Sequence, residues 1–511
     1  MYQSILSGAF HGMDCYLVSV EVDVSDGLPC MEMIGYLAGQ VKETRDRVRV
    51  GIKNSGYKIP PKRITISLSP ADIRKDGNGF DLAVALGILG AMNGNAWKGR
   101  RVLVLGELGL DGAVKEVRGV LPVLLSASQA GITCCIVPKG NETEARIANH
   151  MHVVAVSSLK EAVSSMNRLM SGEEPTLEKK TDGESVQAVY ETDFSQVAGQ
   201  EQAKRAAEIA AAGMHNILLF GPPGSGKSMI AERVRTILPP MTYDERLETT
   251  KIRSILGEMN GRKTLVMERP YEMANPLITP QAFLGGGAVP MPGIVTKAHN
   301  GVLFLDELPE FGRAKLDLLR QPLEEKKIRI LRKQYACEYN SDFMLVAAMN
   351  PCPCGYFPDR NKCNCRTHEI TSYLKRISGA FLDRIDISVE TQKVEWEQIV
   401  RKKEAESSET IRKRVETAYH FQMQRQGKLN ANLTSEETEK VCVLAREAED
   451  MLRFVFSQKG KSVRGFDRIR KLARTIADLE QEEKIDARHM AEAIMLNGGM
   501  ETLMRRKEGE V

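Results

Sequence analysis

The sequence predicts an α/β protein whose C-terminal part is all helical, and three observations lead to this fold class. Segments with the two-residue period of half-buried strands, such as CYLVSVEVDVS at 15–25, alternate with segments whose apolar residues recur at helical spacing. A strand, a glycine-rich loop and a helix follow one another at residues 215–234, in HNILLFGPPGSGKSMIAERV. Residues 396–511 are charged, almost free of proline and apolar at every third or fourth position, which is typical of amphipathic helices.

The domain organisation follows from length and from shifts in composition. A chain of 511 residues is too long for one hydrophobic core, so about three domains are expected. We expect an α/β domain at 1–165, a linker at 166–192, a second α/β domain at 193–395 and a helical domain at 396–511. The linker is assigned because its residues are polar, charged and poor in aromatic side chains.

The composition limits the class of protein. Apolar residues make up 42% and the formal net charge is +4, so any surface that binds nucleic acid has to be local. No apolar run approaches the roughly 18 residues that span a bilayer, and the N-terminus lacks the pattern of a signal peptide. Ten cysteines without an export signal are typical of a reducing compartment. We therefore expect a cytoplasmic protein with no membrane contact.

A phosphate-binding loop is predicted at GPPGSGKS, which fits the pattern G-x-x-x-x-G-K-[ST] between a strand and a helix. Backbone N–H groups of such a loop surround phosphates, Lys227 reaches the β- and γ-phosphates, and Ser228 gives its hydroxyl to Mg²⁺. The nucleotide-binding residues predicted here are Gly221, Pro222, Pro223, Gly224, Ser225, Gly226, Lys227, Ser228 and Met229.

Polar side chains at the ends of two further apolar strands complete the predicted site for ATP and Mg²⁺. GVLFLDELPEF contains Asp306, expected to hold the magnesium shell, and Glu307, expected to orient or deprotonate the attacking water. Caps or ion pairs are the weaker alternative for these carboxylates. The strand FMLVAAMNP contains Asn350, which we expect to position that water.

Four cysteines follow Asn350 directly, as two close pairs separated by eight residues. Four thiolates suit tetrahedral Zn²⁺, and the loop GYFPDRNK between the pairs has no apolar core of its own. A pair of redox-active thiols is the alternative, and His368 is near enough in sequence to replace one cysteine. The predicted structural zinc ligands are Cys352, Cys354, Cys363 and Cys365.

The order of these parts over residues 193–511 resembles the AAA+ ATPases. The resemblance implies backbone contacts to adenine from Val197 and Gly199 in DFSQVAGQEQAKRA. It also implies an arginine that acts on the neighbouring subunit's γ-phosphate, Arg384 in FLDRID, with Arg376 as a second candidate. Arg464 would reach back to its own chain's nucleotide from the helix SVRGFDRIRKLARTIADL. A solvated helix face is the alternative for each arginine.

A basic hairpin narrows the resemblance to the magnesium-chelatase and MCM branch of that family. KKIRILRKQYACEY is predicted to form a β-hairpin, and in this branch such hairpins point into the pore of a ring. We expect Arg329, Arg332 and Lys333, with Tyr335 nearby, to follow a nucleic-acid backbone. A solvated, charged hairpin is the alternative. A basic face is also expected on a helix of the C-terminal domain, from Arg468, Arg470, Lys471 and Arg474.

The N-terminal domain resembles a Lon-type proteolytic fold in LSPADIRKDGNGFDLAVALGIL and LGELGLDGAVKEVRGVLP. A Lon-type protease needs a serine just after KDG and a lysine in the second segment. Here KDG is followed by Asn78, Gly79 and Phe80, and Leu121 stands at the lysine position. Without a nucleophile and a base there is no acyl transfer, so no protease activity is expected.

The whole chain resembles the ComM/YifB family, through VKETRDRVR, SPADIRKDG, VLFLDELPEF, AAMNPCPCG, FLDRID and ARTIADL. The resemblance implies a hexameric, ATP-dependent DNA helicase that drives branch migration of recombination intermediates, notably in natural transformation. Asn275 and Pro276 stand where that family usually has histidines. Whatever those histidines contribute to substrate contact or coupling is therefore in doubt for this chain. The alternative is a chelatase-like or chaperone-like ATPase that remodels a protein partner, since the AAA+ core alone does not decide the substrate.

Overall fold

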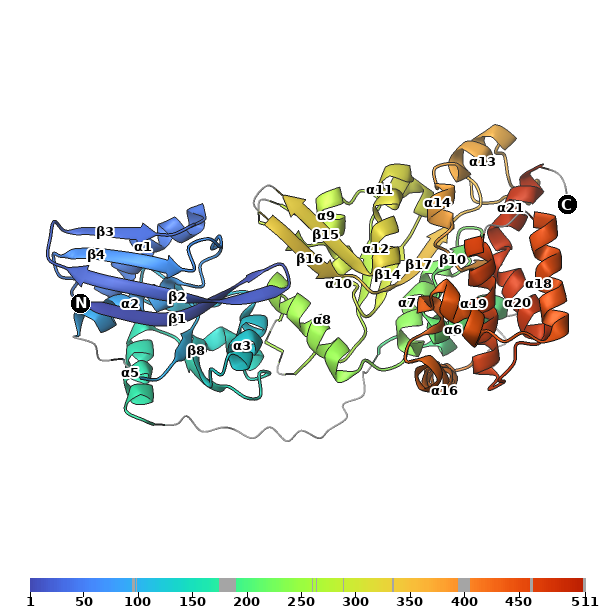
Figure 1. Ribbon diagram of the computed structural model, residues 1–511. Helices are drawn as coiled ribbons and strands as arrows, with labels where there is room; N and C mark the ends of the chain where they lie inside the picture. Colours follow the sequence, from blue (N-terminus) through green and yellow to red (C-terminus); the bar gives the residue numbers. More distant parts are fainter. Residues whose placement is uncertain are drawn as a thin grey trace.

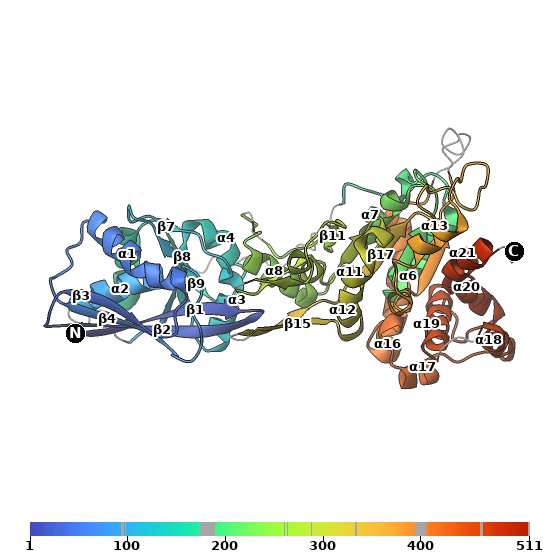
Figure 2. The same cartoon turned by 90° about the horizontal axis from the view of Figure 1, so that it is seen from above.

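The computed structural model of the chain is elongated, with the N-terminal α/β part at one end and the C-terminal helices at the other (Figures 1 and 2). It describes residues 1–93, 97, 99–173, 190–259, 261–262, 264–287, 289–332, 335–393, 405–459 and 463–508. Within these residues, every helix is too short or too polar to cross a membrane.

The N-terminal part is built on a mixed seven-stranded sheet with the strand order β3-β4-β2-β1-β5-β8-β9. Its strands are β1 (Tyr2–His11), β2 (Asp14–Ser25), β3 (Cys30–Ile34), β4 (Arg63–Ser69), β5 (Val102–Val104), β8 (Cys134–Pro138) and β9 (His152–Val156). Its helices are α1 (Gly39–Asn54), α2 (Asp81–Met92), α3 (Val120–Gln129), α4 (Glu142–Ala145) and α5 (Leu159–Met170). The short strands β6 (Glu107–Leu108) and β7 (Val114–Lys115) pair with each other.

Helix α2 is apolar on all sides and lies in the core of this part, and its first residue joins two sequence signatures. Asp81 is fully buried and accepts hydrogen bonds from Thr44 Oγ1 (2.6 Å) and Arg47 Nε (2.9 Å). Arg47 also donates to Asn78 Oδ1 at 3.2 Å. A buried ion pair therefore holds the segments VKETRDRVR and KDGNGFD together. The role of these polar residues in the structure is to join the two segments.

The start of the predicted linker is corrected by the structure. Residues 166–170 belong to helix α5, because Met166 and Leu169 pack into the apolar core of the N-terminal part. Ser158 begins this helix by accepting a hydrogen bond from the Glu161 N–H. Residues 174–189 of the predicted linker lie outside the described residues.

The central part contains an all-parallel five-stranded sheet with the order β11-β14-β17-β10-β18. The three central strands are buried on both faces, as their continuous apolar runs predict. The strands are β10 (Ile217–Phe220), β11 (Tyr271–Ala274), β14 (Val302–Leu305), β17 (Met344–Met349) and β18 (Ile387–Glu390). The helices are α6 (Glu201–Gly213), α7 (Lys227–Ile237), α11 (Gly312–Leu318), α12 (Arg320–Glu325), α13 (Thr367–Leu374) and α14 (Gly379–Leu382).

Two insertions extend from this sheet toward the N-terminal part (Figure 1). The first contains α8 (Tyr243–Leu256), α9 (Pro280–Leu284), β12 (Gly285–Gly286), β13 (Met291–Pro292) and α10 (Ile294–Lys297). The second is the antiparallel hairpin of β15 (Lys327–Arg332) and β16 (Tyr335–Asn340), which confirms the predicted hairpin. Helix α8 starts at a capping box of Thr242 and Glu245 and stops at Gly257, whose φ of 76° suits glycine.

The C-terminal part is helical, as predicted, and shares one core with the central sheet. Its helices are α16 (Ser408–Gln426), α17 (Ser435–Val441), α18 (Arg446–Lys459), α19 (Val463–Leu479), α20 (Ala487–Asn497) and α21 (Gly499–Glu508). Leu472 and Ile476 of α19 pack in the same apolar cluster as Ala207 and Ile217 of the central part.

Candidate active site and candidate metal centre

The predicted phosphate loop lies between β10 and α7 and has the backbone that its glycines permit. Gly224 and Gly226 have φ values of 75° and 88°, a region that other residues rarely adopt. Gly221 passes so close to Thr391 that a Cβ atom would lie 2.2 Å from the Thr391 carbonyl oxygen. Helix α7 begins at Lys227, so its first N–H groups are free to bind an anion.

Lys227 extends along the loop and meets the end of the neighbouring strand. Its Nζ donates to the carbonyl oxygens of Gly221 and Pro222, both at 2.9 Å, and to Asn350 Oδ1 at 3.2 Å. Burial lowers the pKa of the Lys227 ammonium, and the charge of Asp306 opposes that effect. The structure therefore brings the predicted lysine and the predicted sensor residue into direct contact.

Asp306 and Ser228 form the second half of this arrangement. Ser228 Oγ donates to Asp306 Oδ2 at 3.1 Å, which places a hydroxyl and a carboxylate together as a magnesium site needs. Glu307 follows with a φ of 51°, and its N–H donates to Asp306 Oδ1 at 2.9 Å. Because β17 lies between β14 and β10, the residues after these three parallel strands meet at one edge of the sheet.

The segment predicted to contact adenine through its backbone lies next to the phosphate loop. Val197 is buried in the apolar core, and Gly199 has a φ of 60°. The next residue, Gln200, donates from Nε2 to the carbonyl oxygens of Ser225 (3.0 Å) and Gln392. Sequence analysis missed Gln200, although it directly follows the predicted glycine. Met229 is 44% exposed on α7.

A cavity of about 410 Å³ lies next to this segment. It is bounded by Glu201 and Gln202 of α6, by Phe220 at the start of the phosphate loop, and by α20 and α21. Met495, Leu496 and Leu503 give it an apolar wall from the C-terminal helices. No local pattern indicated this wall, because it forms only when the last helices fold back on β18.

Arg384 lies at the opposite edge of the sheet from the phosphate loop of its own chain. The parallel register pairs Ile217 with Ile387, so a residue before Ile387 is at the amino edge, whereas the loop follows β10 at the carboxyl edge. Asn216 Nδ2 donates to the Arg384 carbonyl oxygen at 2.8 Å. The Arg384 guanidinium donates to Glu324 Oε1.

The structure corrects the expected direction of Arg464. Its Nη1 lies 3.6 Å from Glu324 Oε1, the same oxygen that Arg384 contacts, so both arginines are at the amino edge. Arg464 thus contacts a residue that lies beside Arg384, away from the carboxyl edge where its own chain's phosphate loop lies. Arg376, the second candidate, is paired with Glu310 at 2.7 Å and lies over the ring of Tyr373.

In the part of the hairpin whose side chains the structure describes, the cations have acidic partners that the predicted basic hairpin did not include. Arg329 pairs with Glu338 at 3.1 Å and lies 3.7 Å from Glu325, and Lys327 also contacts Glu338. Leu331 is 76% exposed on the same strand. Lys333 and the side chains of Arg332 and Tyr335 lie outside the described residues.

The expectation of a basic face on α19 is wrong. Arg474 is 1% exposed and pairs with Asp478 at 3.0 Å inside the C-terminal part. Arg468 donates to the Ile385 carbonyl oxygen at 2.9 Å, and Arg470 and Lys471 donate to the carbonyl oxygens of Cys442 and Leu433. These cations satisfy carbonyl groups at loop ends and join the helix to the sheet, so they are not displayed for a ligand.

Asn275 and Pro276 form an exposed turn after β11. Asn275 Oδ1 accepts a hydrogen bond from the Leu277 N–H at 2.8 Å, and Lys315 Nζ donates to the Pro276 carbonyl oxygen. Leu277, the next residue, is 88% exposed. Neither side chain supplies the ring nitrogen that a histidine would offer here.

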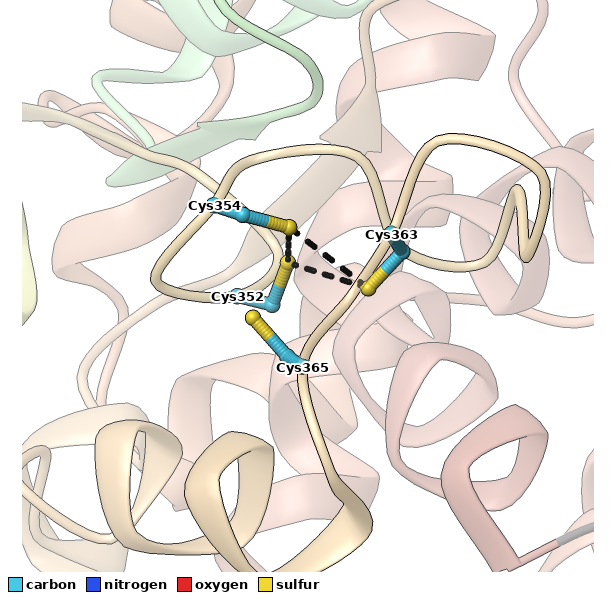
Figure 3. Close-up of side chains that lie close together, drawn as sticks. All are labelled: Cys352, Cys354, Cys363 and Cys365. Carbon is cyan, nitrogen blue, oxygen red and sulfur yellow. Dashed lines mark hydrogen bonds between the residues drawn. The ribbon is translucent and has the colours of Figure 1, made fainter.

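The four cysteines converge, as Figure 3 shows, with all four Sγ atoms within 4.8 Å of one another. Cys352 Sγ lies 3.4 Å from Cys354 Sγ and 3.8 Å from Cys363 Sγ. Four thiolates around Zn²⁺, with Zn–S bonds of about 2.3 Å, would have sulfur atoms about 3.8 Å apart. The donor set therefore fits a tetrahedral zinc site, and His368 is not part of it.

The thiols of the cluster differ in their electrostatics: burial raises the pKa of Cys363 and of Cys365, whereas the pKa of Cys354 is lowered. Burial raises the pKa of the Cys354 thiol, but hydrogen bonds from the Tyr356 N–H and the neighbouring thiols outweigh burial and lower it to about 6. The turn beyond Cys354 packs closely against the phosphate loop. A Cβ atom on Gly355 would lie only 2.6 Å from Pro223 Cδ, and 3.7 Å from Asn350 Cγ. The cluster thus supports the segment that positions Asn350.

Comparison with known proteins agrees with this architecture. Residues 193–399 match the family described as magnesium chelatase, subunit ChlI, and residues 20–141 and 405–497 match families described as subunit ChlI of Mg-chelatase and its C-terminal part. A stretch of 158 residues, 29% of this chain, is 30% identical to Lon protease 2 of Bacillus subtilis and covers 28% of that protein. The fold and these matches define a magnesium-chelatase-like AAA+ protein with a Lon-like N-terminal part.

Two relatives match almost throughout. The uncharacterised protein YifB of Escherichia coli is 40% identical over 94% of both chains. The competence protein ComM of Haemophilus influenzae is 38% identical over 96% of both chains. The chain belongs to the ComM/YifB family.

Proposed function

We propose that this protein is an ATP-hydrolysing ring motor that acts on DNA in the cytoplasm, by branch migration in homologous recombination or natural transformation. One observation carries the proposal that it is a ring: the two predicted phosphate-sensing arginines lie at the sheet edge opposite their own phosphate loop. Hydrolysis then needs a second copy of the chain. We infer a hexamer, and the name of the relative ComM, a competence protein, supports a role in DNA uptake or recombination.

In the proposed mechanism, loop N–H groups and Lys227 bind the phosphates of ATP, while Ser228 and Asp306 hold its Mg²⁺. The metal would neutralise charge on the β- and γ-phosphates when bound. Glu307 orients and deprotonates the attacking water, with Asn350 positioning it beside Lys227. The base would lie toward Gly199 and the cavity next to α6, where α20 and α21 supply an apolar wall. Arg384 and Arg464 stabilise the developing charge on the phosphate of the neighbouring subunit.

A structural Zn²⁺ is the second proposed cofactor. The thiolates of Cys352, Cys354, Cys363 and Cys365 would hold it, which ties the two ends of the loop GYFPDRNK together. A closed tetrahedral site of this kind stabilises a segment that lacks an apolar core. Here it would fix the turn that contacts the phosphate loop.

The proposed DNA contact is the β15–β16 hairpin. The side chains proposed to follow the DNA backbone are Arg329, Arg332 and Lys333. Arg329 would exchange its acidic partner Glu338 for phosphate, and Leu331 adds an exposed apolar side chain. The N-terminal part would have no protease activity, because no serine follows KDG in Asn78, Gly79 and Phe80, and Leu121 stands at the expected lysine position.

One observation favours a second candidate function, remodelling of a protein partner. The described cations of the hairpin, Lys327 and Arg329, both contact Glu338, and Arg474 of α19 is buried in a pair with Asp478. A hairpin whose described cations are ion-paired and which has an exposed leucine also suits an unfolded polypeptide.

The test is ATP-dependent migration of a synthetic four-way DNA junction. The wild-type protein should move the junction, and Glu307→Gln should bind ATP but fail to move it, because the water is no longer activated. The ATPase rate should rise when DNA is added. An ATPase that DNA does not stimulate, together with an unmoved junction, would favour the protein-partner function instead.

A further inference from the structure

Glu324, near the end of α12, contacts both of the arginines that we propose to act on the neighbouring subunit. Its Oε1 atom accepts a hydrogen bond from Arg384 Nη2 and lies 3.6 Å from Arg464 Nη1. The two arginines come from segments far apart in sequence, one before β18 and one on α19. A single carboxylate oxygen is therefore the point where they meet.

The surroundings of Arg384 make this contact important for the arginine. Its side chain is 11% exposed, and its Nε atom is buried without a hydrogen-bond partner in the described structure. Burial lowers the pKa of Arg384; Glu324 opposes that shift, whereas the nearby charges of Arg464 and Arg320 add to it. Without the carboxylate, three like charges would lie together with less compensation, so the guanidinium would be held less firmly.

Helix α12 also leads directly into the hairpin. Lys326, with a φ of 57°, turns the chain from α12 into β15, and its carbonyl oxygen accepts from the Ser341 N–H at 2.8 Å after β16. Glu325 lies 3.7 Å from Arg329 of the hairpin. A force on the end of α12 therefore acts on the base of the hairpin.

We propose that Glu324 is a positioning residue that holds Arg384 and Arg464 until the neighbouring subunit's γ-phosphate competes for them, and so links ATP binding next door to the hairpin. This inference rests on the proposed function. The phosphate carries more negative charge than one carboxylate and attracts the same donors, so binding of ATP releases Glu324. Loss of the γ-phosphate returns the arginines to Glu324. Helix α12, which leads into the hairpin, is then held by both arginines again.

The experiment compares Glu324→Gln with Glu436→Gln. Both glutamates are on the surface and ion-paired, Glu436 with Lys440 at 2.7 Å, and exposed pairs contribute little to folding. ATPase rates are measured against ATP concentration, with and without a four-way DNA junction. Thermal unfolding of each variant checks the fold.

In Glu324→Gln, the KM for ATP should fall and the DNA-free rate should rise, each by about threefold or more, because the competitor for the arginines is gone. The ratio of the DNA-stimulated to the DNA-free rate should fall toward one. Glu324→Asp, which keeps the charge on a shorter side chain, should restore part of that ratio. Glu436→Gln should behave as the wild type.

Three outcomes separate this inference from the proposed function. An unchanged KM and an unchanged ratio in Glu324→Gln would overturn the inference and leave a DNA-stimulated wild-type motor standing. A fall in kcat alone would also overturn it, since the carboxylate would then only build the site. A wild-type ATPase that DNA does not stimulate would overturn the link to the hairpin and the proposed function, while a lower KM in the variant would still support competition for the arginines.

Discussion

At the residue scale, the side chains that matter most are those whose position depends on the direction of a strand. Lys227 and Asn350 meet because parallel strands end at the same edge of the sheet. Arg384 lies at the other edge for the same reason, since it precedes β18. The same register thus places one group of residues beside their own chain's phosphate loop and another group at the opposite edge, where we propose that they act on a neighbour's nucleotide.

A mixing experiment tests this assignment. Lys227→Ala and Arg384→Ala should each lower the ATPase rate by about a thousandfold, because one loses phosphate binding and the other loses charge stabilisation. Combined in equal amounts, the two variants should recover activity at about a quarter of their interfaces, where an intact loop meets an intact arginine.

The control is the double variant Lys227→Ala/Arg384→Ala mixed with either single variant. The double variant has neither Lys227 nor Arg384. In either mixture one of these two groups is missing from every subunit, so no interface can be active. If the two single variants stayed inactive when mixed, although they assemble together, Arg384 would act within its own chain.

At the element scale, the loop between β17 and α13 is the segment that the cysteines organise. Cys352 and Cys363 are buried, whereas Cys354 and Cys365 are half-buried, so the cluster lies at the base of the loop. Phe357 adds one apolar side chain beneath it. The loop has few other apolar contacts of its own, which makes its conformation sensitive to whatever joins the sulfur atoms.

Zinc content is the measurable consequence. Protein purified without chelator should contain about one zinc per chain, and Cys354→Ser should lose it, because three thiolates and a hydroxyl bind zinc more weakly. Removal of the metal should lower the melting temperature by about 5 °C. Cys30→Ser, which changes a half-buried cysteine outside the cluster, serves as the control. Wild-type protein that contains no zinc would contradict the site and favour redox-active thiols.

At the scale of the whole molecule, the N-terminal part is fastened to the insertion helix α8 (Figure 2). Glu144 is buried at this contact and accepts hydrogen bonds from Ser254 Oγ of α8 and from the Leu121 N–H at 3.0 Å. Burial raises the pKa of the Glu144 carboxyl, and the hydrogen bonds from Ser254 and Leu121 oppose this effect. Met259, just after α8, packs in the apolar core of the N-terminal part. Leu121, which the sequence analysis placed at the lysine position of a Lon-type protease, thus takes part in the network at this contact between domains.

Ser254→Ala tests that contact. The buried Glu144 carboxylate would lose one donor, which costs about 1–3 kcal/mol, and the melting temperature should fall by a few degrees. Ser435→Ala, which removes an exposed hydroxyl paired with Asp467 at 2.6 Å, should leave the melting temperature nearly unchanged. Equal melting temperatures for the two variants would show that the hydroxyl does not hold the domains together.

Sequence analysis reached the fold class and the place of the candidate nucleotide site because both depend on local patterns. Continuous apolar runs predict buried parallel strands, and GPPGSGKS needs only its own glycines and the following helix to form a phosphate loop. The four cysteines were also within reach, since short spacing along the chain keeps their sulfur atoms together. The wall of the cavity from Met495 and Leu503 was not, because nothing near these residues in sequence indicates what they pack against.

Charged residues show the same limit of sequence analysis, which does not reveal partners from distant segments. The sequence by itself determined which residues are cations, and hence a basic hairpin and a basic helix. Only the tertiary structure decided that Arg425 of α16 reaches Asp478 of α19, and that Arg384 and Arg464 share Glu324. The physical reason is that a periodic apolar pattern acts over one element, whereas the effect of a charge depends on which partner lies within a few ångströms, and distant segments supply that partner.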